Sequence, residues 1–168
     1  MFLAIKLIGC VLIVSACFLT GYTMSRNLFV RRDFLKSFIV FLSALSTNMR
    51  YNSSDIFTLV SLSVREEEMS YFKFDNTLHN QPFETAWSER IRLLPKSLSL
   101  KKSDKELLSE FGRELGKTDI DGQLKHIELY KTVFEKQLYS AEEEISKKSK
   151  LYKTMGLFAG ISIALMII

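Results

Sequence analysis

Apolar residues gather in two blocks, one near each end of the chain. Residues 7–24 and 155–168 contain no charged side chain. As an α-helix the first block is roughly 27 Å long, which matches the hydrocarbon core of a bilayer. The second is only roughly 21 Å long, so it must extend over Leu151 and Tyr152, thin the bilayer or lie partly in the interface. We therefore predict transmembrane helices over residues 5–24 and 151–168.

The region between the blocks, residues 26–150, is dominated by helical periodicity. Residues 31–48 place apolar side chains at steps of three and four, and no Pro or Gly separates them from the first block. Pro82 suits the first turn of a helix that Pro95 ends. No stretch shows the two-residue alternation typical of a strand. The pattern predicts an all-α bundle.

Short polar signals predict where several helices begin. Hydroxyl and carboxylate side chains accept hydrogen bonds from the free amides of a first turn, and acids favour its positive end. A serine followed by a glutamate three residues later forms a capping box. Glycine suits the left-handed position after a helix, here Gly116. The residues expected at helix starts are Ser53 or Ser54, residues 66–68, Ser103 with Glu106, and Thr118 followed by Asp119 and Asp121.

The last helix is expected to be long and to carry a packing seam. Its apolar residues recur every seven positions, with a second set interleaved. Such stepping is typical of a bundle or coiled coil. No helix breaker lies between Gln123 and Met155, so the seam should continue into the second apolar block. The seam residues are Ile120, Leu124, Ile127, Phe134, Leu138, Ala141 and Ile145.

Positive charge lies at the inner edge of each apolar block. The net charge is +4, but residues 37–146 hold 14 bases against 18 acids. Two basic collars therefore flank a mildly acidic middle, which by the positive-inside rule should be cytoplasmic, with the collars at anionic headgroups. A nucleic-acid binder would gather its bases on one patch, so no nucleic-acid partner is expected. The collars are Arg26, Arg31, Arg32 and Lys36, and Lys147, Lys148, Lys150 and Lys153.

Little in the sequence points to catalysis. Residues 112–118 resemble a phosphate-binding P-loop, but only three residues separate the two glycines, and a helix instead of a strand is expected before them. A nucleotide-binding enzyme is therefore the less favoured alternative. His79 and His126 stand apart, the acids form runs typical of solvated helix faces, and Trp87 is expected in the core. We expect no enzyme activity, no cofactor and no metal ion.

Both cysteines, Cys10 and Cys17, lie in the first apolar block. Their spacing of seven places them on one helix face and predicts thiols buried in the membrane. The residues ending at Cys17 also resemble a lipoprotein cleavage site, which leaves an exported helical domain acylated at Cys17 as an alternative. The arginines that follow so closely disfavour export.

Small residues form a ridge in the second apolar block, at Gly156, Gly160 and Ala164. Such ridges let helix backbones approach closely in lipid. Gly9 and Gly21 offer similar positions on the first block. The two membrane helices are expected to pair, or one of them to recruit another membrane protein.

Several motifs together resemble the stage III sporulation protein AB family. The most specific is Leu-x-x-Phe-Gly-x-x-Leu-Gly-x-x-Asp over residues 108–119, followed by Gln123 and by Lys-His-Ile over residues 125–127. The Ala-Trp pair at residues 86–87 and the ending Lys-Leu-Tyr-Lys-x-x-Gly-x-x-x-Gly over residues 150–160 also fit. The similarity extends over nearly the whole chain.

The resemblance implies a function that composition could not show. Family members are similar to the cytoplasmic domains of type II secretion F-type platform proteins, which are antiparallel bundles of about six helices. They belong to a channel between mother cell and forespore in endospore-forming bacteria. A non-enzymatic scaffold on the mother-cell side of the outer forespore membrane is implied, with its central domain cytoplasmic.

The implied partners are a secretion-type ATPase and other membrane subunits of the channel, and a homo-oligomer is a further option. One departure is residues 52–54, which lack the Gly and Pro that family members often have there. The family pattern clusters at one helix junction, so partner contacts are expected at Phe111, Gly112, Gly116, Asp119 and Gln123.

Overall fold

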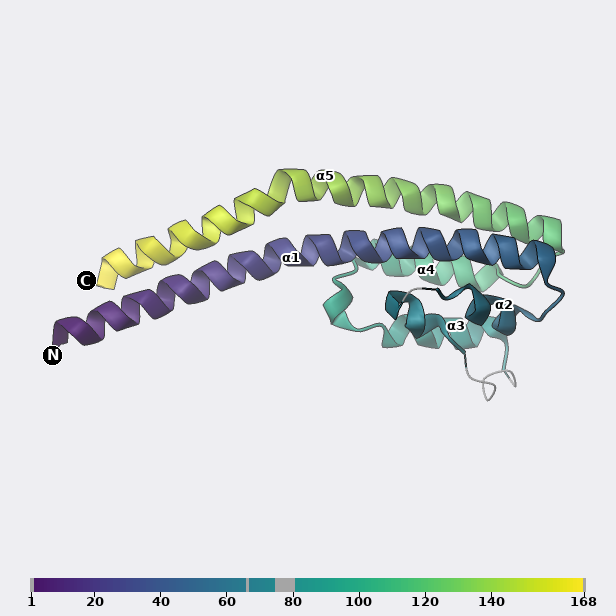
Figure 1. The fold of residues 1–168 in the computed structure, drawn as a ribbon, viewed down its shortest axis with the longest axis horizontal. Helices are drawn as coiled ribbons and strands as arrows, with labels where there is room; N and C mark the ends of the chain where they lie inside the picture. The colour runs from purple at the N-terminus through teal and green to yellow at the C-terminus, as the bar shows by residue number, and fades with distance from the viewer. Residues whose placement is uncertain (1, 66, 75–80, 168) are drawn as a thin grey trace. The chain divides into compact units, whose positions relative to one another are not determined.

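The computed structural model describes residues 2–65, 67–74 and 81–167, and all the regular structure in these ranges is helical (Figure 1). The chain divides into two compact units. A terminal unit comprises residues 1–30 and 140–168, and a middle unit comprises residues 31–139. The all-α prediction is confirmed. The α-helices are α1 (Phe2–Tyr51), α2 (Ile56–Ser63), α3 (Phe83–Leu93), α4 (Lys102–Glu114) and α5 (Ile120–Ile167), and the 3₁₀ helices are η1 (Glu67–Phe72) and η3 (Lys96–Leu98).

The two long helices follow from the absence of breakers. No proline occurs in α1 or α5, and each helix contributes residues to both units. The uninterrupted helices predicted from both apolar blocks into the middle region are therefore confirmed. Residues 67–72 form a 3₁₀ helix instead of the α-helix expected there, while residue 66 and His79 lie outside the described residues.

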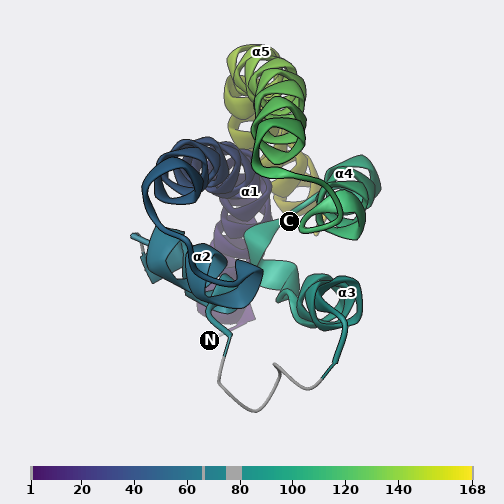
Figure 2. The same ribbon diagram turned by 90° about the vertical axis from the view of Figure 1, so that its right-hand side faces the viewer.

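An aromatic cluster forms the core of the middle unit, which Figure 2 shows end-on with α2, α3 and α4 beside the long helices. Phe38 of α1 is fully buried at its centre. Its ring centroid lies 4.6 Å from that of Phe134 on α5, 5.8 Å from Phe72 on η1 and 5.9 Å from Phe111 on α4. Each such pair adds roughly 0.5–1.5 kcal/mol beyond its buried area. One ring therefore joins four elements that are distant in sequence.

Trp87 of α3 lies in this core, as predicted. It is 0% exposed, and its indole Nε1 donates a hydrogen bond to the Leu108 carbonyl oxygen at 2.7 Å. Its ring stacks on Phe72 with centroids 4.7 Å apart. Because its polar atom is satisfied inside the core, the indole fixes α3 against α4 at low desolvation cost.

Carboxylates, instead of the predicted hydroxyls, cap two of the helices. Asp55 caps α2 by accepting hydrogen bonds from the amides of Phe57 and Thr58, so the expectation for Ser53 or Ser54 was wrong. Asp119 precedes α5 and accepts from Gly122 N at 3.0 Å, so Thr118 is not the cap. An ionised acceptor makes the stronger hydrogen bond and also gains from the helix dipole, which explains the preference.

The start of α4 differs from the prediction as well. The helix begins at Lys102, and Asp104 accepts from the Lys101 amide at 2.8 Å, so the box expected for Ser103 and Glu106 was wrong. Similarly, Pro82 is the residue before α3 and not part of its first turn.

The seam of α5 begins later than its sequence pattern predicts. Ile127, Phe134 and Ala141 are 1%, 0% and 2% exposed, whereas Ile120 is 58% exposed. At the start of the helix the inward position is occupied by Gln123, which is 4% exposed. The first turn of α5 therefore packs through a polar side chain, whose contacts form the junction described below.

Candidate functional site

Within the terminal unit, glycines let α1 and α5 touch backbone to backbone. A Cβ atom on Gly21 of α1 would overlap the carbonyl oxygen of Tyr152 on α5. A Cβ atom on Gly156 of α5 would lie 2.7 Å from the carbonyl oxygen of Cys17. Any larger residue at either position would force the helices apart, so this close packing requires glycine.

The remaining small residues lie at the same helix contact. A Cβ atom on Gly160 would lie 2.9 Å from the Cα of Val14. Ala164 is 8% exposed, and its carbonyl oxygen accepts from the Cys10 thiol at 3.7 Å. The structure thus brings Gly156, Gly160 and Ala164 together against α1, whereas Gly9 has no neighbour within 4 Å of an added Cβ.

The outer surface of this helix pair is apolar. In water, a surface so rich in large apolar side chains would be strongly unfavourable, whereas in lipid it costs nothing. Helix α1 is the one helix in the described part of the chain that is long and apolar enough to cross a membrane. The exposed side chains include Ile8, Val11, Leu12, Leu19, Met155, Phe158, Leu165 and Met166, from 58% upward.

Four of the eight collar cations pair with carboxylates that the structure describes. Arg32 contacts Asp33 at 2.6 Å, and Lys147 and Lys148 each contact the glutamate four residues earlier at 2.6 Å. The hydrogen bond that Lys148 donates to Glu144, followed by the negative charge of Glu144, raises the pKa of Lys148. Counting collar residues therefore overstates the charge available to headgroups.

Arg31, the fourth paired cation, is a structural residue that the sequence assigned to the collar. It is 3% exposed, and its Nε and Nη2 atoms bond both oxygens of the fully buried Asp104 at 2.7 and 2.9 Å. Nη2 also donates to Gln137 Oε1 at 3.3 Å. A bidentate pair of this kind is strongly directional, so it fixes the start of α4 relative to α1 and α5 within the middle unit.

The second candidate site is the junction between α4 and α5, where Gln123 closes the turn. Its Oε1 accepts from the Gly116 amide at 2.9 Å, and its Nε2 donates to Thr118 Oγ1 at 2.7 Å and to the Glu114 carbonyl oxygen at 3.4 Å. Gly116 has φ +84°, as predicted for the left-handed position. One buried amide side chain thus satisfies the backbone polar groups that the helix end leaves open.

This closure also bears on the P-loop resemblance. A P-loop presents backbone amides to phosphate, but here Gln123 occupies the Gly116 amide. Lys117 lies 3.2 Å from Glu84 and 3.6 Å from Glu114 instead of pointing at an open anion site. The geometry is that of a helix connection.

Gly112 makes the closest contact between α3 and α4. A Cβ atom there would overlap the five-membered ring of Trp87. On the other side of α4, the Phe111 ring stacks on His126 with centroids 5.4 Å apart, and His126 Nε2 lies 3.0 Å from the Phe111 carbonyl oxygen. The neighbouring Tyr130 ring lies 4.7 Å from His126, and burial is the first cause that raises the pKa of Tyr130, followed by the charge of Glu110.

The five predicted contact residues therefore divide into two groups. Phe111, Gly112 and Gln123 are buried, whereas Gly116 and Asp119 are exposed. The buried members pack the junction, and only the exposed members and their neighbours are accessible to another protein.

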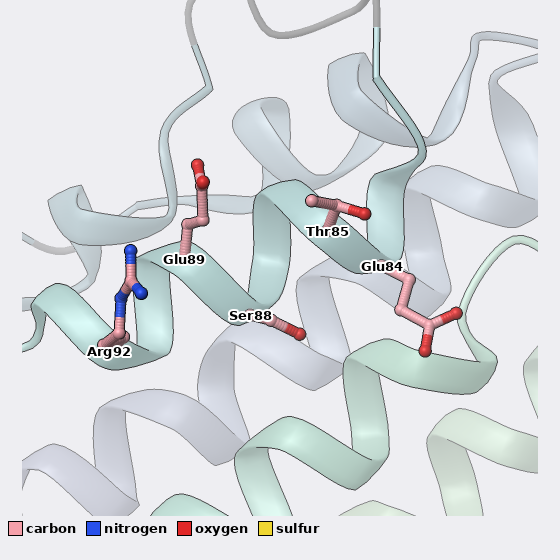
Figure 3. Close-up of a pocket in the computed structure, with 5 residues that line it drawn as sticks. All are labelled: Glu84, Thr85, Ser88, Glu89 and Arg92. Carbon is pink, nitrogen blue, oxygen red and sulfur yellow. The ribbon is translucent and has the colours of Figure 1, made fainter.

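A polar groove of about 370 Å³ runs along the outer face of α3. Its lining side chains project from this one helix in different directions and do not converge on a point (Figure 3). Across the described ranges, no group of three His, Cys, Asp or Glu is placed to hold a metal ion. The groove is lined by Glu84, Thr85, Ser88, Glu89 and Arg92.

Comparison with known proteins connects both units to one family. The family model described as Stage III sporulation protein AB (spore_III_AB) matches residues 6–168. The chain is 30% identical over 169 residues to "Stage III sporulation protein AB" of Bacillus subtilis (strain 168), a match that spans 97% of this chain and 99% of that protein. No solved structure matches the chain. The resemblance noted in its motifs is confirmed: the chain belongs to the Stage III sporulation protein AB family.

Proposed function

We propose that this protein is a non-enzymatic membrane scaffold in the channel between mother cell and forespore. The observation that carries the proposal is the contact of Gly21 and Gly156 beneath an outward surface of large apolar side chains. This arrangement suits a helical hairpin in lipid, with the middle unit as a docking domain. The family's name supports the link to sporulation.

In this proposal the membrane helices occupy residues 5–24 and 151–168, and residues 26–150 lie in the mother-cell cytoplasm. The second apolar block is short, so its pairing with α1 helps to hold it in the bilayer. The basic residues that follow the first block and precede the second support this orientation.

Topology can be tested with cysteine variants of the full chain in sporulating cells. In a Cys10→Ser, Cys17→Ser background, Ser97→Cys should react with a membrane-impermeant maleimide only after lysis. The membrane fraction should retain the protein, because anchoring does not depend on Cys17. Labelling in intact cells, or an acylation mass shift at Cys17 in the unmodified chain, would instead support the exported lipoprotein.

Docking of the secretion-type ATPase is proposed at the exposed side of the α4–α5 junction. Lys117 and Asp119 are accessible there, while Phe111, Gly112 and Gln123 hold the turn in place from within. The arrangement supports a contact surface whose exposed residues are held in position by the buried residues of the family motif.

Co-purification tests the docking surface. The full chain in detergent should retain the partner ATPase. Lys117→Glu should weaken retention by roughly tenfold, because the new carboxylate at the rim of the interface would repel the acidic group that Lys117 attracts. Lys136→Glu is the matched control, since Lys136 is also exposed but lies on α5 away from the turn. Equal retention by both variants would show that the junction is not part of the interface. In a separate assay, ATP hydrolysis by the purified chain that Lys117→Ala abolishes would support the enzyme alternative.

A further inference from the structure

Tyr22, Ser25, Arg26, Phe29 and Lys153 line a cavity of about 220 Å³ in the terminal unit. Arg26 is the first charged residue after the first apolar block, and Lys153 is the last before the second. Each helix therefore changes from apolar to charged at this cavity. In a bilayer this level is the headgroup region, where aromatic and basic side chains are enriched.

The two cations in the cavity differ from most of their collar neighbours. Lys147 and Lys148 are held by glutamates at 2.6 Å. Among the residues that the structure describes, no carboxylate lies within ion-pair distance of Arg26 or Lys153, and both side chains are exposed. Two unneutralised cations from different helices thus converge on one cavity.

The remaining lining adds hydrogen-bonding groups and shape. The Lys153 ammonium lies 5.7 Å from the centroid of the Tyr22 ring, which holds this flexible side chain toward the cavity. The Ser25 hydroxyl, 1% exposed, bonds the Ser149 hydroxyl at 2.8 Å and fixes the two helices at this level. Arg26 can grip an anion with a planar fork, and Lys153 adds a point charge.

We infer that this cavity binds the phosphodiester headgroup of an anionic phospholipid in the cytoplasmic leaflet. Its volume is below the roughly 300 Å³ at which pockets begin to enclose a whole small-molecule ligand, so it suits a headgroup whose acyl chains remain outside. Those chains would lie along the apolar outer face of the helix pair. The inference rests on the proposed membrane insertion of the terminal unit.

Native mass spectrometry of the detergent-solubilised full chain tests the site, with phosphatidylglycerol and phosphatidylcholine as probes. The unmodified chain should retain phosphatidylglycerol in preference to phosphatidylcholine. Removing two basic residues near a headgroup should weaken this preference by roughly tenfold to thirtyfold. We expect that loss for the double variant Arg26→Gln, Lys153→Gln.

The matched control is Lys147→Gln, Lys148→Gln, which removes the same charge from cations that already have partners and should keep the preference. An equal loss in the control would show a diffuse electrostatic effect and overturn the site. So would the absence of any preference in the unmodified chain. Displacement of the lipid by millimolar inorganic phosphate would assign the cavity to a soluble anion instead. None of these results depends on the topology or co-purification experiments, so the two proposals can fail separately.

Discussion

The contact between Gly112 and Trp87 makes a quantitative prediction about the middle unit. In Gly112→Ala, the new methyl group would overlap the indole ring. The indole cannot move away easily, because it is 0% exposed and is packed against Phe72 and Phe111 with centroids 4.7 and 5.7 Å apart. Overpacking at a rigid site costs roughly 3 kcal/mol, while replacing a helical glycine with alanine returns about 1 kcal/mol.

The expected net loss is about 2 kcal/mol in the free energy of unfolding, or roughly 10 °C in melting temperature for a unit of this size. Thermal unfolding of the full chain in detergent, followed by far-UV circular dichroism, measures it. Ser109→Ala, on the same helix, is the control and should change stability by no more than about 0.5 kcal/mol.

A double-mutant cycle separates the clash from other effects. Trp87→Leu alone should destabilise by roughly 3–5 kcal/mol, because it empties part of the core. In that background Gly112→Ala should be neutral or stabilising by up to about 1 kcal/mol, since the obstructing ring is gone. The same loss from Gly112→Ala in both backgrounds would refute the steric explanation.

Three further predictions follow from polar and membrane contacts. Asp104→Ala should lower the free energy of unfolding by roughly 3–5 kcal/mol in denaturant titrations, because Arg31 keeps its buried charge, whereas the pair Arg31→Met, Asp104→Leu should recover most of that loss. The raised pKa of Tyr130 contributes stability that is complete below the unfolded-state pKa of about 10 and is lost as pH rises through the higher folded-state value, so Tyr130→Phe should reduce the alkaline loss of stability measured by thermal unfolding. Gly156→Leu should widen the distance between spin labels on α1 and α5 in dipolar electron paramagnetic resonance, whereas Gly9→Leu should leave it unchanged, because Gly156 contacts the other helix and Gly9 does not.

The local features of the fold could be predicted from sequence because their causes are local. Long stretches without breakers gave continuous helices, a glycine at the end of α4 adopted positive φ, and the apolar face of α3 placed Trp87 in the core. The residue that caps each helix was harder to predict, because several adjacent polar side chains could accept the first-turn hydrogen bonds. At α2 and α5 a carboxylate accepts them.

The contacts between distant segments could not be predicted from spacing. Arg31 and Asp104 are separated by 73 positions, so nothing near Arg31 distinguishes it from its half-buried neighbour Arg32. Gln123 was recognised as part of a motif, but its three hydrogen bonds depend on how the turn before α5 folds. Likewise, the small residues indicated a packing face, whereas the match of Gly21 with Gly156 depends on helix register.

The separation between Arg31 and its carboxylate has a consequence during biosynthesis. Asp104 follows Arg31 by 73 positions, so Arg31 is synthesised before the carboxylate that it binds in the folded protein. In the proposed topology, the Arg31 charge would at that stage favour the cytoplasmic side of the membrane for its end of α1. Once the middle unit folds, the same guanidinium disappears into the protein interior. In the folded protein Arg31 is a buried packing residue. A count of the positive charges beside the membrane should therefore include Arg31 for the newly made chain and omit it for the folded one.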